Sequence, residues 1–149
     1  MKKSQDMNDI TSGFLKMRDH YLCNAEETIK KEELRKASEL LWGAITQAIK
    51  ALGSASNIYI GKHGEFFDFV RDVGKETKDK ELYLLFLDLN ALHKNFYDET
   101  IPSRDFPIYY EKAYLFLRKI DGIMKKVLEA KSGTPNKMKF TEQFTNKNE

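Results

Sequence analysis

Three histidines, His20, His63 and His93, are the side chains of this chain best suited to move a proton near neutral pH. They come from three separate segments. Metal-binding helical bundles usually carry Glu-x-x-His or His-x-x-x-His, because residues three or four apart share a helix face. None of the three histidines has a Glu three positions before it, and no two are close in sequence. We therefore expect no metal site and no cofactor.

His93 is the most informative of the three, because it falls inside the apolar stripe of a predicted helix. Asn90 precedes it by three residues, Lys94 borders it and Tyr97 follows four residues later, so these four side chains are predicted to form one polar patch. One interpretation is structural, with a core histidine bonded to Tyr97 as a buried phenol. The other is that the patch contacts a ligand such as a nucleotide or RNA. If any residue is catalytic, it is His93.

The cysteine, the tryptophan and the hydropathy of the chain give further expectations about burial and location. The single cysteine, Cys23, lies in a helical pattern beside Leu22 and is predicted to be a buried or half-buried thiol. Trp42 is predicted to lie in the core rather than to stack on a base. The first three residues are followed by a polar run, which is not a secretory signal, and the longest uncharged stretch, residues 51–61, is too short for a membrane helix. We expect a cytoplasmic protein without a membrane partner.

The charge is divided unevenly along the chain. Residues 131–149 hold four lysines and two glutamates, whereas residues 1–130 hold 21 basic and 21 acidic groups. A surface that follows the phosphates of DNA needs clustered Lys and Arg, so no strong DNA-binding surface is expected. A small local basic patch remains compatible with these counts.

Apolar residues three or four apart define the elements that must position these groups. The periodicity predicts helices over residues 10–31, 33–52, 64–73, 80–98 and 107–130. Short connections between long helices favour antiparallel neighbours. The sequence therefore predicts an all-α fold, an up-and-down helical bundle of four main helices plus one short helix.

The ends of the chain and two glycines set the predicted boundaries. We expect a flexible N-terminus over residues 1–9, a bundle over residues 10–131 and a disordered C-terminal tail over residues 132–149 that is dispensable for folding. Gly53 and Gly74 are predicted to end the second and third helices, because glycine readily takes the left-handed conformation that terminates a helix.

The fourth predicted helix is apolar on two sides. Besides its main stripe it carries Leu84, Leu87 and Ala91 as a second stripe on the opposite side. A four-helix bundle seldom covers both sides of one helix. The second stripe packs beneath the short third helix, or it forms the interface of a homodimer. We expect a homodimer and take Leu84, Leu87 and Ala91 as candidate interface residues.

Two motifs resemble a known superfamily. Residues 36–44 (KASELLWGA) with residues 48–52 (AIKAL) resemble the second-helix signature of the HEPN superfamily, named for higher eukaryotes and prokaryotes nucleotide-binding. Residues 92–98 (LHKNFYD) are similar to a segment of its archaeal paREP branch. The resemblance covers residues 14–127. It implies a HEPN-like helical bundle, usually dimeric, in a cytoplasmic archaeal protein.

Many members of that superfamily are metal-independent ribonucleases with an Arg four to six residues before a His. Here no Arg precedes His93 at that spacing, and the nearest such pair is Arg18 with His20. We therefore expect a non-catalytic dimer that binds a nucleotide, RNA or a protein partner. One alternative is an endoribonuclease that uses His93 with a positive group such as Lys94 or Arg71. Another is a purely structural interaction module.

Overall fold

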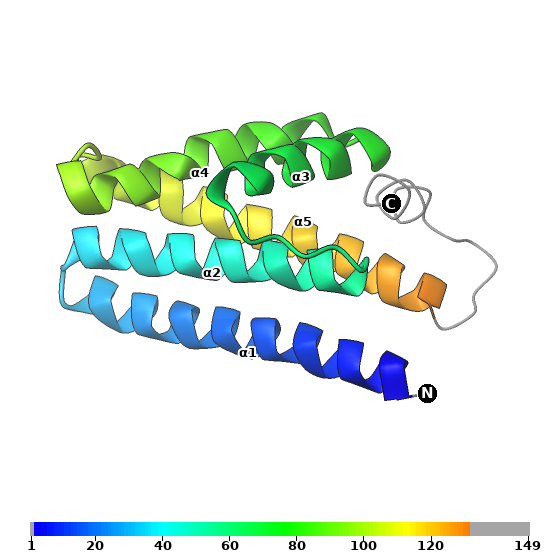
Figure 1. The fold of residues 1–149 in the computed structure, drawn as a ribbon. Helices are drawn as coiled ribbons and strands as arrows, with labels where there is room; N and C mark the ends of the chain where they lie inside the picture. Colours follow the sequence, from blue (N-terminus) through cyan, green and yellow to red (C-terminus); the bar gives the residue numbers. More distant parts are fainter. Residues whose placement is uncertain (1, 132–149) are drawn as a thin grey trace.

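The computed structural model describes the backbone of residues 2–131 and the side chains of residues 9–131. The predicted tail, residues 132–149, lies outside this part. The described chain is all-helical and contains no strand, which confirms the predicted all-α class. Its elements are α1 (Lys2–Lys30), α2 (Leu34–Ala55), α3 (His63–Glu76), α4 (Lys80–Asp98), the short 3-10 helix η1 (Ser103–Asp105) and α5 (Phe106–Lys131) (Figure 1).

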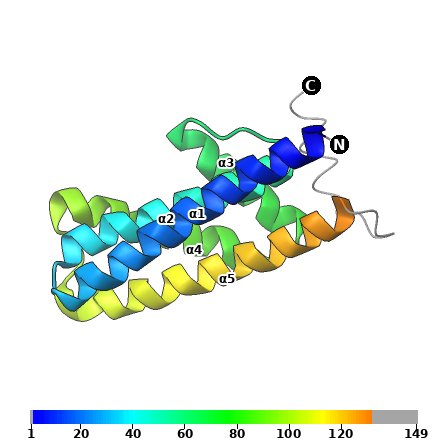
Figure 2. The same cartoon turned by 90° about the horizontal axis from the view of Figure 1, so that it is seen from below.

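Four long helices lie side by side, and the shorter α3 packs on α4 (Figure 1). After α2 the chain runs back along the bundle through residues 56–62, so α3 starts beside the middle of α2 and runs antiparallel to α4 (Figure 1). Seen from below, α5 runs alongside α1 and α2 (Figure 2). The returning segment therefore brings the first residue of α3 close to both α2 and the second half of α4.

Gly53 does not end α2 as predicted, because the helix continues to Ala55. The left-handed residue of this turn is Asn57, with a φ of 62°. A Cβ atom on Gly53 would lie 2.9 Å from both the carbonyl oxygen of Ile58 and the Cδ1 atom of Ile60. The glycine therefore serves the close approach of the returning chain rather than the end of the helix.

Two other helix limits differ from the sequence prediction. The first helix begins at Lys2, within the segment 1–9 that was predicted to be a flexible N-terminus. The third helix passes through Gly74 and ends at Glu76. A Cβ atom on Gly74 would lie 3.2 Å from the carbonyl oxygen of Asp79, so this glycine lets the next helix begin close by.

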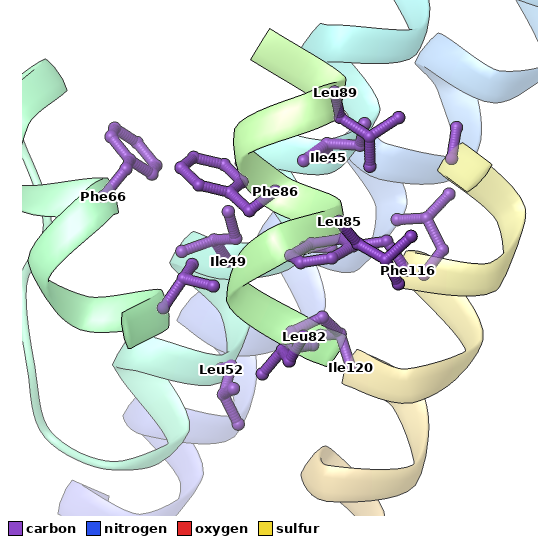
Figure 3. Packing of buried hydrophobic residues seen from close by; sticks show 14 of the residues in the cluster. Ile45, Ile49, Leu52, Phe66, Leu82, Leu85, Phe86, Leu89, Phe116 and Ile120 are labelled. Atoms are coloured by element: carbon purple, nitrogen blue, oxygen red, sulfur yellow. The ribbon is translucent and has the colours of Figure 1, made fainter. Parts of the chain in front are cut away.

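The core lies where α2, α4 and α5 face one another, and α3 closes one side (Figure 3). Trp42 is 4% exposed, which confirms its predicted core position. Within residues 2–131, no helix combines the length and the apolar run that crossing a bilayer requires. The largest fully buried side chains are Leu41, Ile45, Ile49, Leu52, Val70, Leu82, Phe86, Leu89, Leu92, Phe116 and Ile120.

Polar contacts join α1 to α5. The guanidinium of Arg18 donates to the Asp121 carboxylate at 2.6 Å. The hydroxyls of Tyr110 and Tyr114 both donate to the same oxygen of Glu26, each at 2.6 Å. Burial and the hydrogen bond to Glu26 raise the pKa of Tyr114, so its hydroxyl remains a donor at neutral pH.

One prediction about burial is wrong, and one of the two alternatives for the second stripe of α4 is not observed. Cys23 is exposed, because α1 packs through the face that carries Ala25 and Thr28, and Cys23 lies on its outer side. The second stripe of α4 is not covered by α3, since Leu84 and Leu87 are 59% and 42% exposed. This apolar surface is thus left open to solvent in the single chain.

The limits predicted for the fourth helix, residues 80–98, are confirmed by α4. The Asp79 carboxylate caps it by accepting hydrogen bonds from the backbone N–H groups of Glu81 and Leu82. Lys119 donates to the other carboxylate oxygen at 2.8 Å. Burial alone raises the pKa of Asp79, but these hydrogen bonds and the Lys119 charge outweigh burial and lower it below the ordinary value.

Replacing Asp79 by alanine is expected to lower the free energy of unfolding by about 1–2 kcal/mol at neutral pH, because α4 loses its N-cap. The folded-state pKa of Asp79 is depressed, so its stabilising effect is present above the unfolded pKa and is lost as the pH falls through the folded value. Urea unfolding at about pH 7 and about pH 3 should show a difference between parent and variant that shrinks in acid. A difference that grows in acid would contradict this role.

Candidate functional site: an imidazole–aromatic cluster

His93 bonds to a carboxylate on a neighbouring helix. Its Nδ1 atom lies 3.0 Å and 3.1 Å from the two carboxylate oxygens of Glu39, which comes from the first half of α2. Both side chains are about one-third exposed. An ionised carboxylate accepts hydrogen bonds, so the pairing favours a proton on Nδ1 and fixes the orientation of the ring.

The imidazole of His93 also lies against the single tryptophan. The ring centroids of Trp42 and His93 are 5.7 Å apart, with an angle of 28° between the planes. Trp42 in turn stacks on Phe86 at 5.3 Å, which anchors the indole in the core. The indole therefore forms a rigid, buried floor beneath a partly exposed imidazole.

A second imidazole reaches the same place from α3. His63, the first residue of that helix, is exposed, and its ring centroid lies 5.8 Å from that of His93 and 6.2 Å from that of Trp42. Its ring also meets Phe67 edge-on at 5.4 Å. The cluster of Glu39, Trp42, His63, Phe67, His93 and Tyr97 is called the imidazole cluster below.

The predicted patch on α4 is only partly brought together. Tyr97 meets His93 edge-on at 5.4 Å, but it is 63% exposed, so the prediction of a buried phenol bonded to His93 is wrong. The partner of the imidazole is Glu39 instead. Asn90 is half-buried and Lys94 is exposed, and the contacts of His93 are with other residues. Lys94 follows His93 directly, so its side chain leaves the helix about 100° away.

The start of α2 holds the end of α4 in place. The guanidinium of Arg35 donates to the carbonyl oxygen of Phe96 at 2.8 Å and 3.1 Å, and to the Glu99 carboxylate at 2.9 Å. One turn further along α2, the Oγ of Ser38 accepts a hydrogen bond from the buried Asn95 amide at 3.0 Å. These bonds fix the last turns of α4, where His93 and Tyr97 are placed.

Four residues of the cluster, Glu39, Trp42, His63 and Phe67, were not among the predicted site residues. Glu39 was part of the polar face predicted for the second helix, and its spacing of three from Trp42 was the available signal. His63 carried no such signal, because only the returning segment before α3 brings it to His93. Among the residues with described side chains, no three His, Cys, Asp or Glu groups are placed to hold a metal ion.

The cluster can do two things chemically. Its partly exposed rings offer faces on which a flat base can stack. Its two imidazoles offer a donor and an acceptor near each other, which is what proton transfer at a phosphate ester needs. Neither positive group predicted to assist His93 contacts its ring. Lys94 leaves α4 in another direction, and Arg71 pairs with Asp68 and Asp72 on α3. The cluster therefore has groups that suit the binding of a base, but no positive group that would stabilise negative charge on a reacting phosphate.

The protein is thus an all-helical bundle in which a histidine of α4, held by a carboxylate of α2, lies where α2, α3 and α4 meet. The sequence model of the archaeal PaREP1/PaREP8 family matches residues 14–117, more than half of the chain. The protein belongs to this archaeal family, which confirms that part of the resemblance seen in residues 92–98. No curated protein and no solved structure matches the chain.

Proposed function

We propose that this protein binds a nucleotide or single-stranded RNA at the imidazole cluster, and that it works as a cytoplasmic homodimer. The observation that carries the proposal is the pair of partly exposed imidazoles, 5.8 Å apart, above the buried indole of Trp42. Base recognition in single strands rests on such rigid aromatic faces combined with a few hydrogen-bonding groups. His93, held by Glu39, supplies an oriented ring nitrogen for that purpose.

A HEPN-like origin of the bundle belongs to the same proposal. The segment 36–44, which resembles the HEPN signature, contains Glu39 and Trp42. The segment 92–98, which resembles the paREP branch, contains His93. The two segments that carry the resemblance thus meet at the imidazole cluster, as expected if the resemblance reflects a shared binding site.

The second candidate function is cleavage of RNA, and the position of His63 favours it. Two imidazoles close together can act as general base and general acid, and the Glu39 carboxylate orients the ring of His93. A third group must offset the negative charge that develops on the phosphate. The contacts of the cluster include no Lys or Arg among residues 9–131. Binding of a nucleotide or RNA without cleavage is therefore the function that these contacts favour.

Replacing His93 by alanine is expected to weaken the binding of a fluorescent mononucleotide or short RNA by about ten-fold, the effect of losing one stacking face. The free energy of unfolding should fall by only about 1 kcal/mol, because Glu39 remains partly hydrated. His20→Ala is the matched control, since His20 is an exposed histidine of α1 that contacts only Asn24 among the described hydrogen bonds. Fluorescence anisotropy measures binding, and urea unfolding measures stability.

Equal affinity of the parent, His93→Ala and His20→Ala would contradict the proposed site. The same samples, incubated with mixed RNA and run on a denaturing gel, separate the two candidate functions. Intact RNA in every lane supports binding alone. Cleavage by the parent that is lost in both His93→Ala and His63→Ala would place the ribonuclease function first.

Replacing both Leu84 and Leu87 by glutamate is expected to turn a dimeric parent into a monomer that keeps its helical fold. The two leucines are 59% and 42% exposed, so the change adds charge to an open apolar surface and leaves the core intact. Ile108→Glu is the matched control, because Ile108 is 51% exposed on α5. Sedimentation at micromolar concentration gives the mass, and a monomeric parent would contradict the homodimer.

A further inference from the structure

Basic side chains gather at the end of the α3–α4 pair that lies far from the imidazole cluster. A hollow of about 560 Å³ is lined there by residues of α3, the connecting turn and the start of α4. A second hollow, of about 390 Å³, adjoins it across the turn and reaches α5. Together the two are lined by six cations and by only two acids, Glu76 and Asp79. The cations are Arg71, Lys75, Lys78, Lys80, Lys119 and Lys126.

Most of these cations are available to an external anion. Lys119 is engaged by Asp79 and Glu81, and Arg71 has two weak acidic neighbours on its own helix. The other four lysines, Lys75, Lys78, Lys80 and Lys126, have no ion pair within residues 9–131. Because Asp68, Asp72 and Glu81 also lie beside these cations, the corner is distinguished by its unpaired lysines rather than by a large net charge.

The basic corner and the imidazole cluster lie along the same pair of helices. Along α3, His63, Phe67, Arg71 and Lys75 follow one another at intervals of four residues, so each side chain is turned about 40° from the one before and Lys75 lies about 120° from His63 around the helix axis. The rise of a helix puts Lys75 about 18 Å from His63 along the axis. The antiparallel α4 runs the other way, so Lys80 lies at the basic corner and His93 at the imidazole cluster, on different faces of α4.

Aromatic side chains lie near both the imidazole cluster and the basic corner. Next to the imidazoles, Phe67 packs edge-on against Phe86 at 4.8 Å. Tyr83, half-buried on α4, lines the basic hollow beside Arg71 and Lys80. Aromatic rings thus occur both at the imidazole cluster and in the basic hollow. A combination of rings and cations suits a single strand of nucleic acid, in which bases and phosphates are both exposed.

We propose that single-stranded RNA lies along the α3–α4 pair, with one base at the imidazole cluster and its backbone phosphates at the basic corner formed by Lys75, Lys78 and Lys80. The inference rests on the proposed function and extends it from a mononucleotide to a strand of about four nucleotides or more. The lysines are flexible point charges without a backbone cradle, so they recognise charge along a polymer rather than one shaped phosphate group. Paired bases could not reach the rings, so duplex RNA is not the ligand.

The test compares RNA ligands of increasing length on the full chain. Fluorescence anisotropy would measure the affinity of the parent for a mononucleotide, a single strand of about eight nucleotides and a duplex of equal length. The variant Lys75→Gln/Lys78→Gln/Lys80→Gln removes the basic corner. The matched control, Lys16→Gln/Lys30→Gln/Lys31→Gln, removes three exposed lysines at α1, on the other side of the bundle. Melting temperatures check that both variants fold.

The parent is expected to bind the strand at least about ten-fold more tightly than the mononucleotide and more tightly than the duplex. The corner variant should lose that gain and keep its affinity for the mononucleotide. Its slope of log affinity against log salt should be smaller by about 2, since each phosphate contact contributes about 0.7. The control variant should behave as the parent.

The outcomes distinguish failure of this inference from failure of the proposed function. If the parent binds the mononucleotide through His93 but gains nothing from length, or if the corner and control variants behave alike, the basic corner does not bind the strand. Equal binding of the duplex would also overturn the inference. If the parent binds no mononucleotide and His93→Ala has no effect on any ligand, the proposed function itself is wrong.

Discussion

Replacing Phe86 by alanine is expected to lower the free energy of unfolding by about 3–5 kcal/mol. The ring of Phe86 is fully buried at the meeting point of four helices (Figure 3). It stacks on Trp42 at 5.3 Å, meets Phe67 edge-on at 4.8 Å and lies 5.9 Å from Phe116. Domains of this size are stable by only about 5–15 kcal/mol, so the loss is a large part of the total.

Urea unfolding of the Phe86 variants would measure this effect. Phe86→Leu is the control, since leucine fills most of the space and should cost clearly less than alanine. A loss below about 1 kcal/mol for Phe86→Ala would mean that the ring does not support the packing of the core. Because Trp42 rests on this ring, the alanine variant should also weaken ligand binding at the imidazole cluster.

Replacing Asn95 by alanine is expected to cost about 2–3 kcal/mol, because two hydrogen bonds of a buried side chain are lost at once. The side chain is 3% exposed. Its amide N–H donates to the Oγ of Ser38 at 3.0 Å, and its oxygen accepts from the backbone N–H of Ile101 at 2.7 Å. The residue therefore ties α4 to α2 and to the loop that leads into α5.

The effect of Asn95→Ala would be followed by thermal and urea unfolding beside Ser38→Ala. Ser38→Ala removes only one of the two bonds of the amide, so it should cost about half as much. Equal stability of parent and Asn95→Ala would show that solvent replaces these bonds. The exposed Asn24→Ala offers a baseline for a surface amide.

The helices could be predicted because their signals are local. The spacing of apolar residues in segment 80–98 and the Asp79 cap are properties of a few adjacent residues, and α4 has the predicted limits. Gly53 was misread because its role depends on the returning backbone at Ile58, a contact that no local pattern contains.

The candidate site was predicted only in part, and for the same reason. His93 stood out because a titratable ring within an apolar stripe is a local anomaly. Its true partner, Glu39, is 54 residues away in sequence, so the local neighbour Tyr97 was assigned to it instead. The buried amide of Asn95 is likewise paired with Ser38, 57 residues away near the start of α2. Pairings between helices depend on the packing of the whole bundle.

The indole between Phe86 and His93 makes the site observable without a label. The chain has one tryptophan, so its entire tryptophan emission comes from this position. The emission of the native protein therefore reports on the surroundings of this indole, and a base that stacks beside His93, or the substitution His93→Ala, would change it.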